Sequence, residues 1–417
     1  MLRREPSLGR PARLAPALLF AASLAVGVAL VATNPQLYWQ QSDAVIYRDA
    51  GAAVLHGRPL YPTLFGPAQL PFTYPPFAGL LFAAGSPLPF GSWKAGLAGL
   101  SLVGLVGSAL AALRLTGRRT ADCWPAAFVF GAIGLWLEPV DSTLSFGQIN
   151  LMVMALVLTD LAFARNTRFG GVGIGLAAGL KITPAIFIGY LLLSGNRREA
   201  GTAALTAAAT VAIGFLALPA DAMRFWGGRI LQPGDGPERL VNQSLRGTFL
   251  RAAHRATGEQ LSWLIAVLAV GVVGLIAAAS ASRAGLELWG VCLCAASGLL
   301  ASPISWSHHW VWVLPVLVLA WQSTAPWRWA ATASVVLLFA WWPLPVGLHG
   351  RWLADVSAHP SGLLRILPHD DGRELRWSGW QMVLGNYYVV AAMLFVLSGS
   401  IAVYRRKHRG GMLSPSE

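Results

Sequence analysis

Charge is scarce in this sequence. Only 12% of its 417 residues are charged, about half of the roughly 25% that is typical of a soluble globular domain. Hydrophobic residues make up 55% of the chain, and its mean hydropathy is +0.56. This composition excludes an ordinary soluble domain, a disordered chain and a coiled coil. It is typical of a protein that crosses a membrane several times.

Cysteine is scarce as well, with three residues in the chain. Cys123 lies in one apolar run, and Cys292 and Cys294 lie in another. Thiols placed in this way exclude a disulfide framework and a zinc cluster. We expect all three to be structural thiols.

Basic residues outnumber acidic ones, 31 against 18, which gives a formal net charge of +13. A nucleic-acid-binding protein would carry this charge in long stripes interleaved with exposed aromatic residues. Here the basic residues form short clusters between apolar runs, as membrane topology requires. The sequence therefore predicts the lipid bilayer as a partner and no nucleic acid.

Charge-free runs mark candidate membrane spans, because a bilayer core of about 30 Å requires about 20 residues of helix. We expect the longest run to be two spans, broken at Ser302-Pro303. The clearest runs are Leu14–Ser42, Ala95–Leu113, Ser142–Thr159, Ala200–Ala220, Gln260–Ser282, Leu288–Trp327, Trp329–Gly350 and Trp377–Tyr404. Shorter runs are Cys123–Leu137, Phe169–Leu180 and Ile182–Asn196. The last two flank Lys181 and predict two short or broken helices.

These runs predict a single all-α polytopic membrane domain over residues 1–417, with about 12 transmembrane helices. The first run is either a secretory signal or a span; since it is long and no small-residue cleavage site ends it, we expect an uncleaved span. Short-loop Lys and Arg residues place both termini in the cytoplasm. Three long segments, 34–74, 221–259 and 349–376, then lie outside, and long loops on one face indicate a functional site there.

Asp43 lies where the first span ends. A partly desolvated carboxylate has a raised pKa and suits a general base that takes a proton from a hydroxyl group. The alternative is that Ser42 and Asp43 cap the helix that follows, and spacing alone favours capping. We expect that helix to lie on the membrane surface and to end at His56-Gly57.

Three further segments place polar groups near or within the membrane. Tyr74 is either a ligand or part of an aromatic belt at the membrane interface, and the belt is the commoner role. Gln148 and Asn150 carry amides that bind sugar hydroxyls or, equally, join helices. Lys181 is an intramembrane cation, which indicates a functional role with a phosphate as its natural partner. The alternative is that the Lys181 side chain extends to the cytoplasmic surface.

The densest polar segment contains Trp306, His308 and His309. Neighbouring residues on a helix point about 100° apart, so the two histidines are poor joint metal ligands. We expect one to face a cavity while the other packs, and together with Asp43 they would form a polar cavity at the outer surface.

The second external segment contains Asn242-Gln243-Ser244, which fits the N-glycosylation pattern, although this tripeptide is common by chance. Arg246 and Arg251 follow it. They are candidate contacts for a phosphate or a sugar, and the alternative is that they keep the loop soluble.

Seven short motifs follow one another between about residues 40 and 312. They are Ser42-Asp43…Tyr47, Gly57-x-Pro59-Leu60-Tyr61, Phe72-Thr73-Tyr74-Pro75-Pro76, Gly147-Gln148-Ile149-Asn150, Lys181-Ile182-Thr183-Pro184, Asn242-Gln243-Ser244 and Ser302-Pro303-Ile304-Ser305-Trp306-x-His308-His309. In this order they resemble glycosyltransferase family eighty-seven, the polyprenyl-phosphomannose-dependent α-1,2-mannosyltransferases of GT-C fold. The residues after 312 carry no motif of the family.

The resemblance implies an inverting enzyme that moves mannose from a polyprenyl-phosphate-linked donor to an envelope glycolipid on the outer face of the cytoplasmic membrane. A phosphatidylinositol mannoside or a lipomannan-type chain would be the acceptor. The base maps to Asp43, with Asp49 the less favoured choice. His308 and His309 map to the His-His motif, and Lys181 would help to bind the donor. The remaining residues expected to contact substrate are Tyr74, Gln148, Asn150, Asn242, Gln243, Arg246 and Trp306.

No Asp-x-Asp pair is present, so the sequence suggests neither a required divalent metal nor another cofactor. Some members of the family transfer arabinofuranose, so the sugar stays open between mannose and a pentose. A lipid transporter and a scaffold subunit are the non-enzymatic alternatives. A transporter would line its path with polar groups at mid-membrane, whereas the polar motifs here lie near one face, apart from Lys181.

Overall fold

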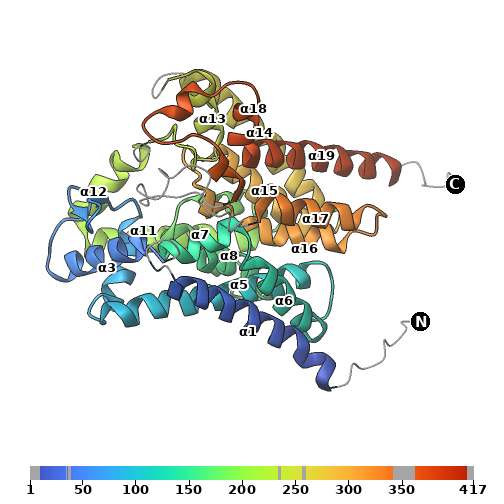
Figure 1. Cartoon of the computed structure of the whole chain (residues 1–417), viewed down its shortest axis with the longest axis horizontal. Helices are drawn as coiled ribbons and strands as arrows, with labels where there is room; N and C mark the ends of the chain where they lie inside the picture. The colour runs from blue at the N-terminus through green and yellow to red at the C-terminus, as the bar shows by residue number, and fades with distance from the viewer. Residues whose placement is uncertain are drawn as a thin grey trace.

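The computed structural model describes residues 10–33, 35, 39–232, 236–255, 260–340 and 362–410. Helices make up most of this part of the chain (Figure 1). Two short strands, β1 (Leu64–Phe65) and β2 (Leu70–Pro71), pair antiparallel in one hairpin. The predicted all-α class is therefore confirmed.

The elements of the first half, apart from this hairpin, are α1 (Arg10–Thr33), α3 (Ser42–Leu55), α4 (Pro76–Gly85), α5 (Phe90–Leu115), α6 (Thr120–Gly134), α7 (Glu138–Phe146), α8 (Asn150–Thr159), η1 (Asp160–Ala164), α9 (Val172–Leu180), η2 (Thr183–Ala185), α10 (Ile186–Leu193) and α11 (Arg197–Ala217). The elements of the second half are α12 (Pro219–Trp226), η3 (Arg229–Leu231), α13 (Leu245–Ala252), α14 (Gln260–Arg283), α15 (Glu287–Ala301), η4 (Ser307–Trp312), α16 (Val313–Gln322), α17 (Arg328–Phe339), η5 (Gly362–Ile366), η6 (Arg373–Arg376), α18 (Trp380–Gly385) and α19 (Tyr387–Gly410).

Five helices are long and apolar enough to cross a membrane, namely α1, α5, α11, α14 and α19. A sixth candidate arises if α7 and the continuous α8–η1 segment, which are bent by 119° at a short break, count as one span. The described chain is thus a polytopic membrane protein, as predicted. The number of about 12 spans stays a prediction, because several of the apolar runs form helices of 10–17 residues.

Most helix breaks occur where the sequence predicts them. The α15 helix ends at Ala301, directly before Ser302-Pro303, and Lys181 separates α9 from η2 and α10. One prediction is wrong: the run Ser142–Thr159 is not a continuous span, because α7 ends at Gly147 in the left-handed conformation, with φ 69°. The third predicted external loop, 349–376, lies outside the described residues up to residue 361.

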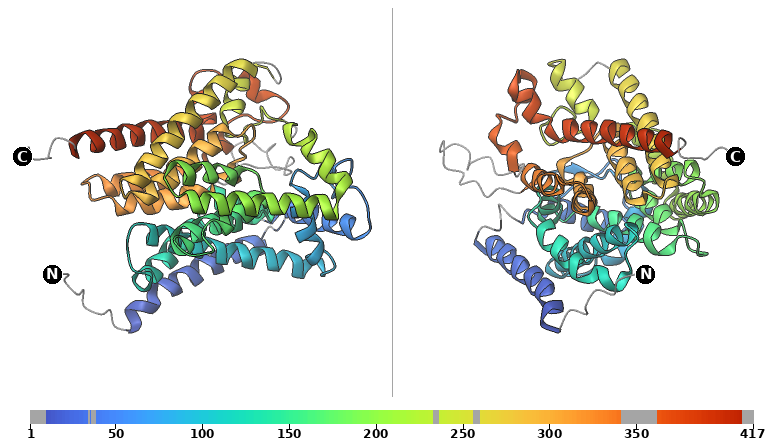
Figure 2. Two further views of the ribbon diagram at one scale, coloured as in Figure 1. Left: turned by 180° about the vertical axis from the view of Figure 1, so that it is seen from behind. Right: turned by 90° about the vertical axis from the view of Figure 1, so that its right-hand side faces the viewer.

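The first turn of α1 and the last turn of α19 lie at the same end of the bundle, whereas α3 and α12 lie toward the opposite end (Figures 1 and 2). Between these ends, α5 packs against α6 and α8, and α14 packs against α15. The elements that carry the predicted site residues, α3, α7, α8 and η4, therefore meet inside a helical framework.

Candidate active site

Asp43 lies in the first turn of α3, directly against the end of α7. Gln41 precedes the helix in a left-handed conformation with φ 56°, and none of its side-chain atoms caps the helix. Its backbone N–H donates to the Ser145 carbonyl at 2.7 Å, and its side-chain amide donates to the Leu144 carbonyl at 2.8 Å. These bonds fix Asp43 beside the turn at Gly147.

Asp43 is therefore not the helix cap, and the favoured prediction of capping is wrong. Gln41 occupies the N-cap position, and the Asp43 carboxylate interacts with Gln148 and Lys181 instead. The turn that carries Gln148 requires glycine at 147, since a Cβ there would lie 2.7 Å from the Ala44 Cβ in addition to the strain of the positive φ.

The pKa of Asp43, on a helix outside the candidate spans, is raised to about 6. Burial is the main cause, because removal from water disfavours the charged form. A hydrogen bond with Gln148, the charge of Lys181 and a hydrogen bond with Ser42 act in the opposite direction. The carboxylate is thus more basic than a free aspartate and still ionised near neutral pH, as a general base requires.

Gln148 joins Asp43 to two tyrosines. The hydroxyls of Tyr47 and Tyr74 donate to its Oε1 at 2.7 Å and 2.8 Å, and they lie 2.7 Å from each other. Since the amide oxygen is occupied by the tyrosines, the amide NH₂ is the group left to donate to Asp43. Tyr74 is buried in this network, so the interpretation as an exposed interface belt does not fit.

Lys181 extends from the break between α9 and η2 toward the same cluster. Its Nζ donates to Asn150 Oδ1 at 2.7 Å and lies 5.6 Å from the centre of the Tyr74 ring. The side chain therefore points to the polar cluster and does not extend to the surface. None of the salt bridges among the described residues includes Lys181, so its charge is available to an anion.

The two histidines follow in η4 and are fixed by the same amide. Asn150 Nδ2 donates to the His308 carbonyl at 2.9 Å. The His308 ring packs against Phe146, and its Nε2 is buried without a hydrogen-bond partner among the described residues. The His309 ring stands at 85° to it and lines a small cavity together with Lys181 and Asn150. The two rings thus divide as predicted, one packed and one on a cavity.

The sequence analysis missed Glu138, which is fully buried at the start of α7. Its Oε1 accepts hydrogen bonds from Ser142 at 2.9 Å and from Ser307 at 2.8 Å, and its Oε2 accepts one from Tyr388. Ser307 directly precedes His308, so Glu138 links the histidine segment to α7 and to α19. The only signal in the sequence was an acidic residue within an apolar stretch. The partners of Glu138 could not be predicted, because Ser307 and Tyr388 lie far from it in sequence.

The other predicted site residues belong to the surrounding framework. Asn242 and Gln243 are fully buried and bond to backbone groups, for example from Gln243 Nε2 to the Gly385 carbonyl at the end of α18, at 2.7 Å. Because Asn242 is buried, the N-glycosylation interpretation does not fit. Arg251 is also buried, and its guanidinium donates to Asn386 and to backbone carbonyls.

Three further predicted site residues lie outside the cluster. Arg246 lies over the Trp263 ring at 5.7 Å. Trp306 forms an isolated β-bridge with Asn242. Asp49 is on α3, six positions after Asp43, and no hydrogen bond in the described part of the chain joins it to the cluster. The cluster therefore consists of Asp43, Tyr47, Tyr74, Gln148, Asn150 and Lys181, with His308 and His309 beside it.

Comparison with known proteins identifies the family of this chain. Residues 72–303 match the family described as Glycosyltransferase family 87. A polyprenol-phosphate-mannose-dependent alpha-(1-2)-phosphatidylinositol mannoside mannosyltransferase of Mycolicibacterium smegmatis is 33% identical over 88% of this chain and 85% of its own length. The enzyme of the same description from Mycobacterium tuberculosis is 31% identical over 87% of this chain and 85% of its own.

A polyprenol-phosphate-mannose-dependent alpha-(1-2)-phosphatidylinositol pentamannoside mannosyltransferase of Mycolicibacterium smegmatis is 37% identical over 60% of this chain and 60% of its own length. No solved structure matches the chain. The family match covers more than half of the sequence, and the first two relatives cover 88% and 87% of it. The chain therefore belongs to glycosyltransferase family 87 and is a membrane glycosyltransferase.

Proposed function

We propose that this enzyme transfers mannose from polyprenyl-phosphate-mannose to a phosphatidylinositol mannoside, forming an α-1,2 linkage with inversion at the anomeric carbon. The relatives named above support the donor and the acceptor class. The observation that carries the chemistry is a pair of opposite, half-buried charges in one cluster, the Asp43 carboxylate and the Lys181 ammonium, whose charges interact.

In this mechanism Asp43 takes the proton from the acceptor hydroxyl as its oxygen attacks the anomeric carbon. The bond from that carbon to the phosphate oxygen breaks, and the negative charge passes to the leaving lipid phosphate. Lys181 stabilises this charge, and a cation acts most strongly in a site from which water is excluded. Gln148 holds the carboxylate in place, since the tyrosines fix its own orientation. His309, on the cavity beside Lys181, is the closer of the two histidines to the phosphate in this arrangement.

We also propose the GT-C architecture with about 12 spans, both termini in the cytoplasm and the active site on the outer face of the cytoplasmic membrane. The common end of α1 and α19, opposite to α3, supports this orientation (Figure 1). Several short basic loops support it too, since Lys and Arg favour the cytoplasmic side.

The test is an assay of the purified protein in lipid nanodiscs with polyprenyl-phosphomannose and a phosphatidylinositol mannoside, followed by mass spectrometry. We expect a gain of one hexose that is lost in Asp43→Asn and kept in Asp49→Asn, a matched change on the same helix outside the cluster. Full activity of Asp43→Asn would overturn the assignment of the base. A pentose gained from polyprenyl-phosphoarabinose, with no hexose from the first donor, would overturn the choice of sugar.

A further inference from the structure

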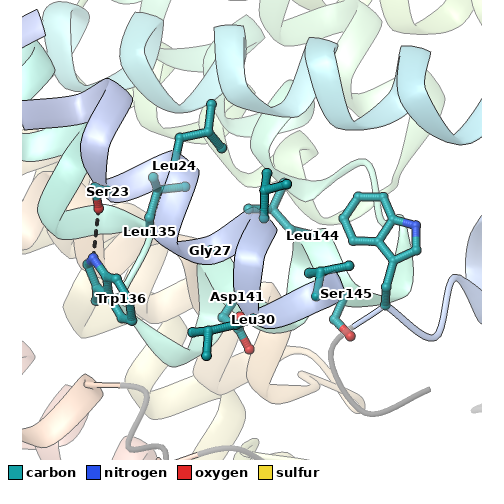
Figure 3. Close-up of a pocket in the computed structure, with 12 residues that line it drawn as sticks. Ser23, Leu24, Gly27, Leu30, Leu135, Trp136, Asp141, Leu144 and Ser145 are labelled. Atoms are coloured by element: carbon teal, nitrogen blue, oxygen red, sulfur yellow. Dashed lines mark hydrogen bonds between the residues drawn. The ribbon is translucent and has the colours of Figure 1, made fainter. Parts of the chain in front are cut away.

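A groove of about 300 Å³ runs between α1 on one side and, on the other, α7 and the turn that precedes it (Figure 3). Its walls are mainly apolar and include Leu24, Gly27 and Leu30 of α1 and Leu144 of α7. None of the residues that line it lines the cavity at Lys181. The groove is therefore a separate binding surface, next to the cluster described above and not part of it.

The two ends of this groove differ in polarity. At one end Trp136 Nε1 donates to Ser23 Oγ at 2.7 Å, so these two groups satisfy each other (Figure 3). At the other end lie Trp39, Asp141 and Ser145. The stretch of α1 from Ser23 to Val31 is about 12 Å long. An apolar channel of this length holds part of one hydrocarbon chain, with the attached headgroup at the polar end.

The polar end of the groove adjoins the proposed base. The carbonyls of Leu144 and Ser145, two residues that line the groove, accept the hydrogen bonds that Gln41 donates at the start of α3. Asp43 follows two residues later. A headgroup at this end of the groove is thus placed next to the carboxylate that would deprotonate it.

We propose that this groove binds an acyl chain of the glycolipid acceptor. The inference rests on the proposed function, which requires a lipid donor and a lipid acceptor, and it gives the binding site of the acceptor lipid. The phosphate of the donor belongs at Lys181, where Phe187 and Trp312 give the donor lipid an apolar wall of its own. An inverting displacement needs the acceptor hydroxyl and the leaving phosphate on opposite faces of the sugar. The groove lies along α7 and the donor cavity along α8, on either side of the bend at Gly147.

The headgroup end carries groups that suit a sugar. Trp39 offers an amphipathic aromatic surface, and the Asp141 carboxylate accepts hydrogen bonds from hydroxyls. Donor and acceptor both contain a lipid phosphate, so the choice of the acceptor rests on the position of this end beside the start of α3 and away from the cavity at Lys181.

Gly27 provides a way to fill the groove without disturbing the protein. A Cβ at this position would meet no heavy atom within 4 Å, and Gly27 lines the groove, so a leucine there fits the protein and narrows the groove. Gly271→Leu is a matched control: it is the same change in the apolar helix α14, with the same open surroundings, and it lies outside the groove.

The direct test is photolabelling of the protein in nanodiscs, which needs no turnover. The probe is a phosphatidylinositol dimannoside with a diazirine in one acyl chain, and the comparison is a phosphatidylglycerol with the same chain. We expect the dimannoside to label peptides of α1 and α7, unlabelled dimannoside to compete, and Gly27→Leu but not Gly271→Leu to abolish the label. Equal labelling by phosphatidylglycerol would overturn the proposal, because the groove would then hold bulk lipid.

A kinetic test separates the acceptor from the donor. In Gly27→Leu we expect the KM for the diacyl acceptor to rise about tenfold or more, since several buried methylenes are displaced. The KM for the donor and the transfer to methyl α-mannoside, which has no chain, stay unchanged. A rise in the donor KM with both acceptors would overturn the proposal in favour of the donor lipid. Labelling does not depend on transfer. An inactive wild-type protein would therefore refute the proposed function, whereas the labelling result would still decide whether the groove binds the glycolipid.

Discussion

Lys181 and His308 are connected through a single side chain. The Lys181 Nζ donates to Asn150 Oδ1 at 2.7 Å, and Asn150 Nδ2 donates to the His308 carbonyl at 2.9 Å. The cation is thus held on the element that also fixes the histidine segment, although the three residues are far apart in sequence. A movement of α8 changes the position of both groups together.

The first prediction concerns the charge of Lys181. We expect Lys181→Met to lower kcat by about 10²–10³-fold, the range seen when one group that stabilises a developing negative charge is removed. Lys94→Met, the same change at a lysine that lies over the Phe90 ring, is the control and should keep its activity. Steady-state kinetics at saturating donor measure both variants, and equal activity of the two would contradict the role of Lys181.

The second prediction concerns pH. Asp43 has to be ionised to act as a base, and its pKa is about 6, so kcat/KM should fall as the pH drops below about 6 and level off above it. Gln148→Met removes a hydrogen bond that lowers this pKa. The acidic limb of the profile should then move to higher pH. A profile that stays in place in an active Gln148→Met variant would show that another group controls this limb.

Asp43, Gln148, Asn150 and Lys181 were each recognisable from the sequence, because a polar group beside or inside an apolar run is conspicuous. Their arrangement was not. The bend of 119° between α7 and α8 depends on the turn at Gly147 and on its close contact with α3, and sequence spacing indicated one straight span instead. Without this bend Gln148 does not reach Asp43.

The roles of the buried loop residues could not be predicted from the sequence either. Asn242, Gln243 and Arg251 carry groups that bind sugars and phosphates, but the loops use these groups for their own backbone. Side-chain type alone does not distinguish the two uses. Glu138 shows the converse case, because its partner Tyr388 comes from the part of the chain in which the sequence carried no motif.

The third prediction concerns Glu138. Glu138→Gln keeps an oxygen that accepts from Ser142 and Ser307 and should change the midpoint of thermal unfolding little. Glu138→Ala leaves three hydroxyls without this acceptor, at a cost of about 1–3 kcal/mol for each buried group that finds no other partner. We expect a clearly lower midpoint in tryptophan-fluorescence melts of the purified protein. Ser142→Ala removes one of the three hydroxyls that donate to Glu138 and should fall between the two. Equal midpoints for Glu138→Gln and Glu138→Ala would refute the linking role.

The fourth prediction tests how closely α14 and α15 approach each other. At Gly274 a Cβ would lie 1.8 Å from the Ser297 Oγ, whereas at Gly271, less than one turn away, it would meet nothing within 4 Å. Small residues allow membrane helices to pack closely, and here packing and not hydrophobicity holds the helices together. Gly274→Leu should therefore lower the midpoint of thermal unfolding or prevent accumulation in the membrane, while Gly271→Leu should behave like the wild type. Because the two variants have the same composition and hydropathy, a difference between them reports the helix contact alone, and equal stability would show that α14 and α15 do not pack as closely as described.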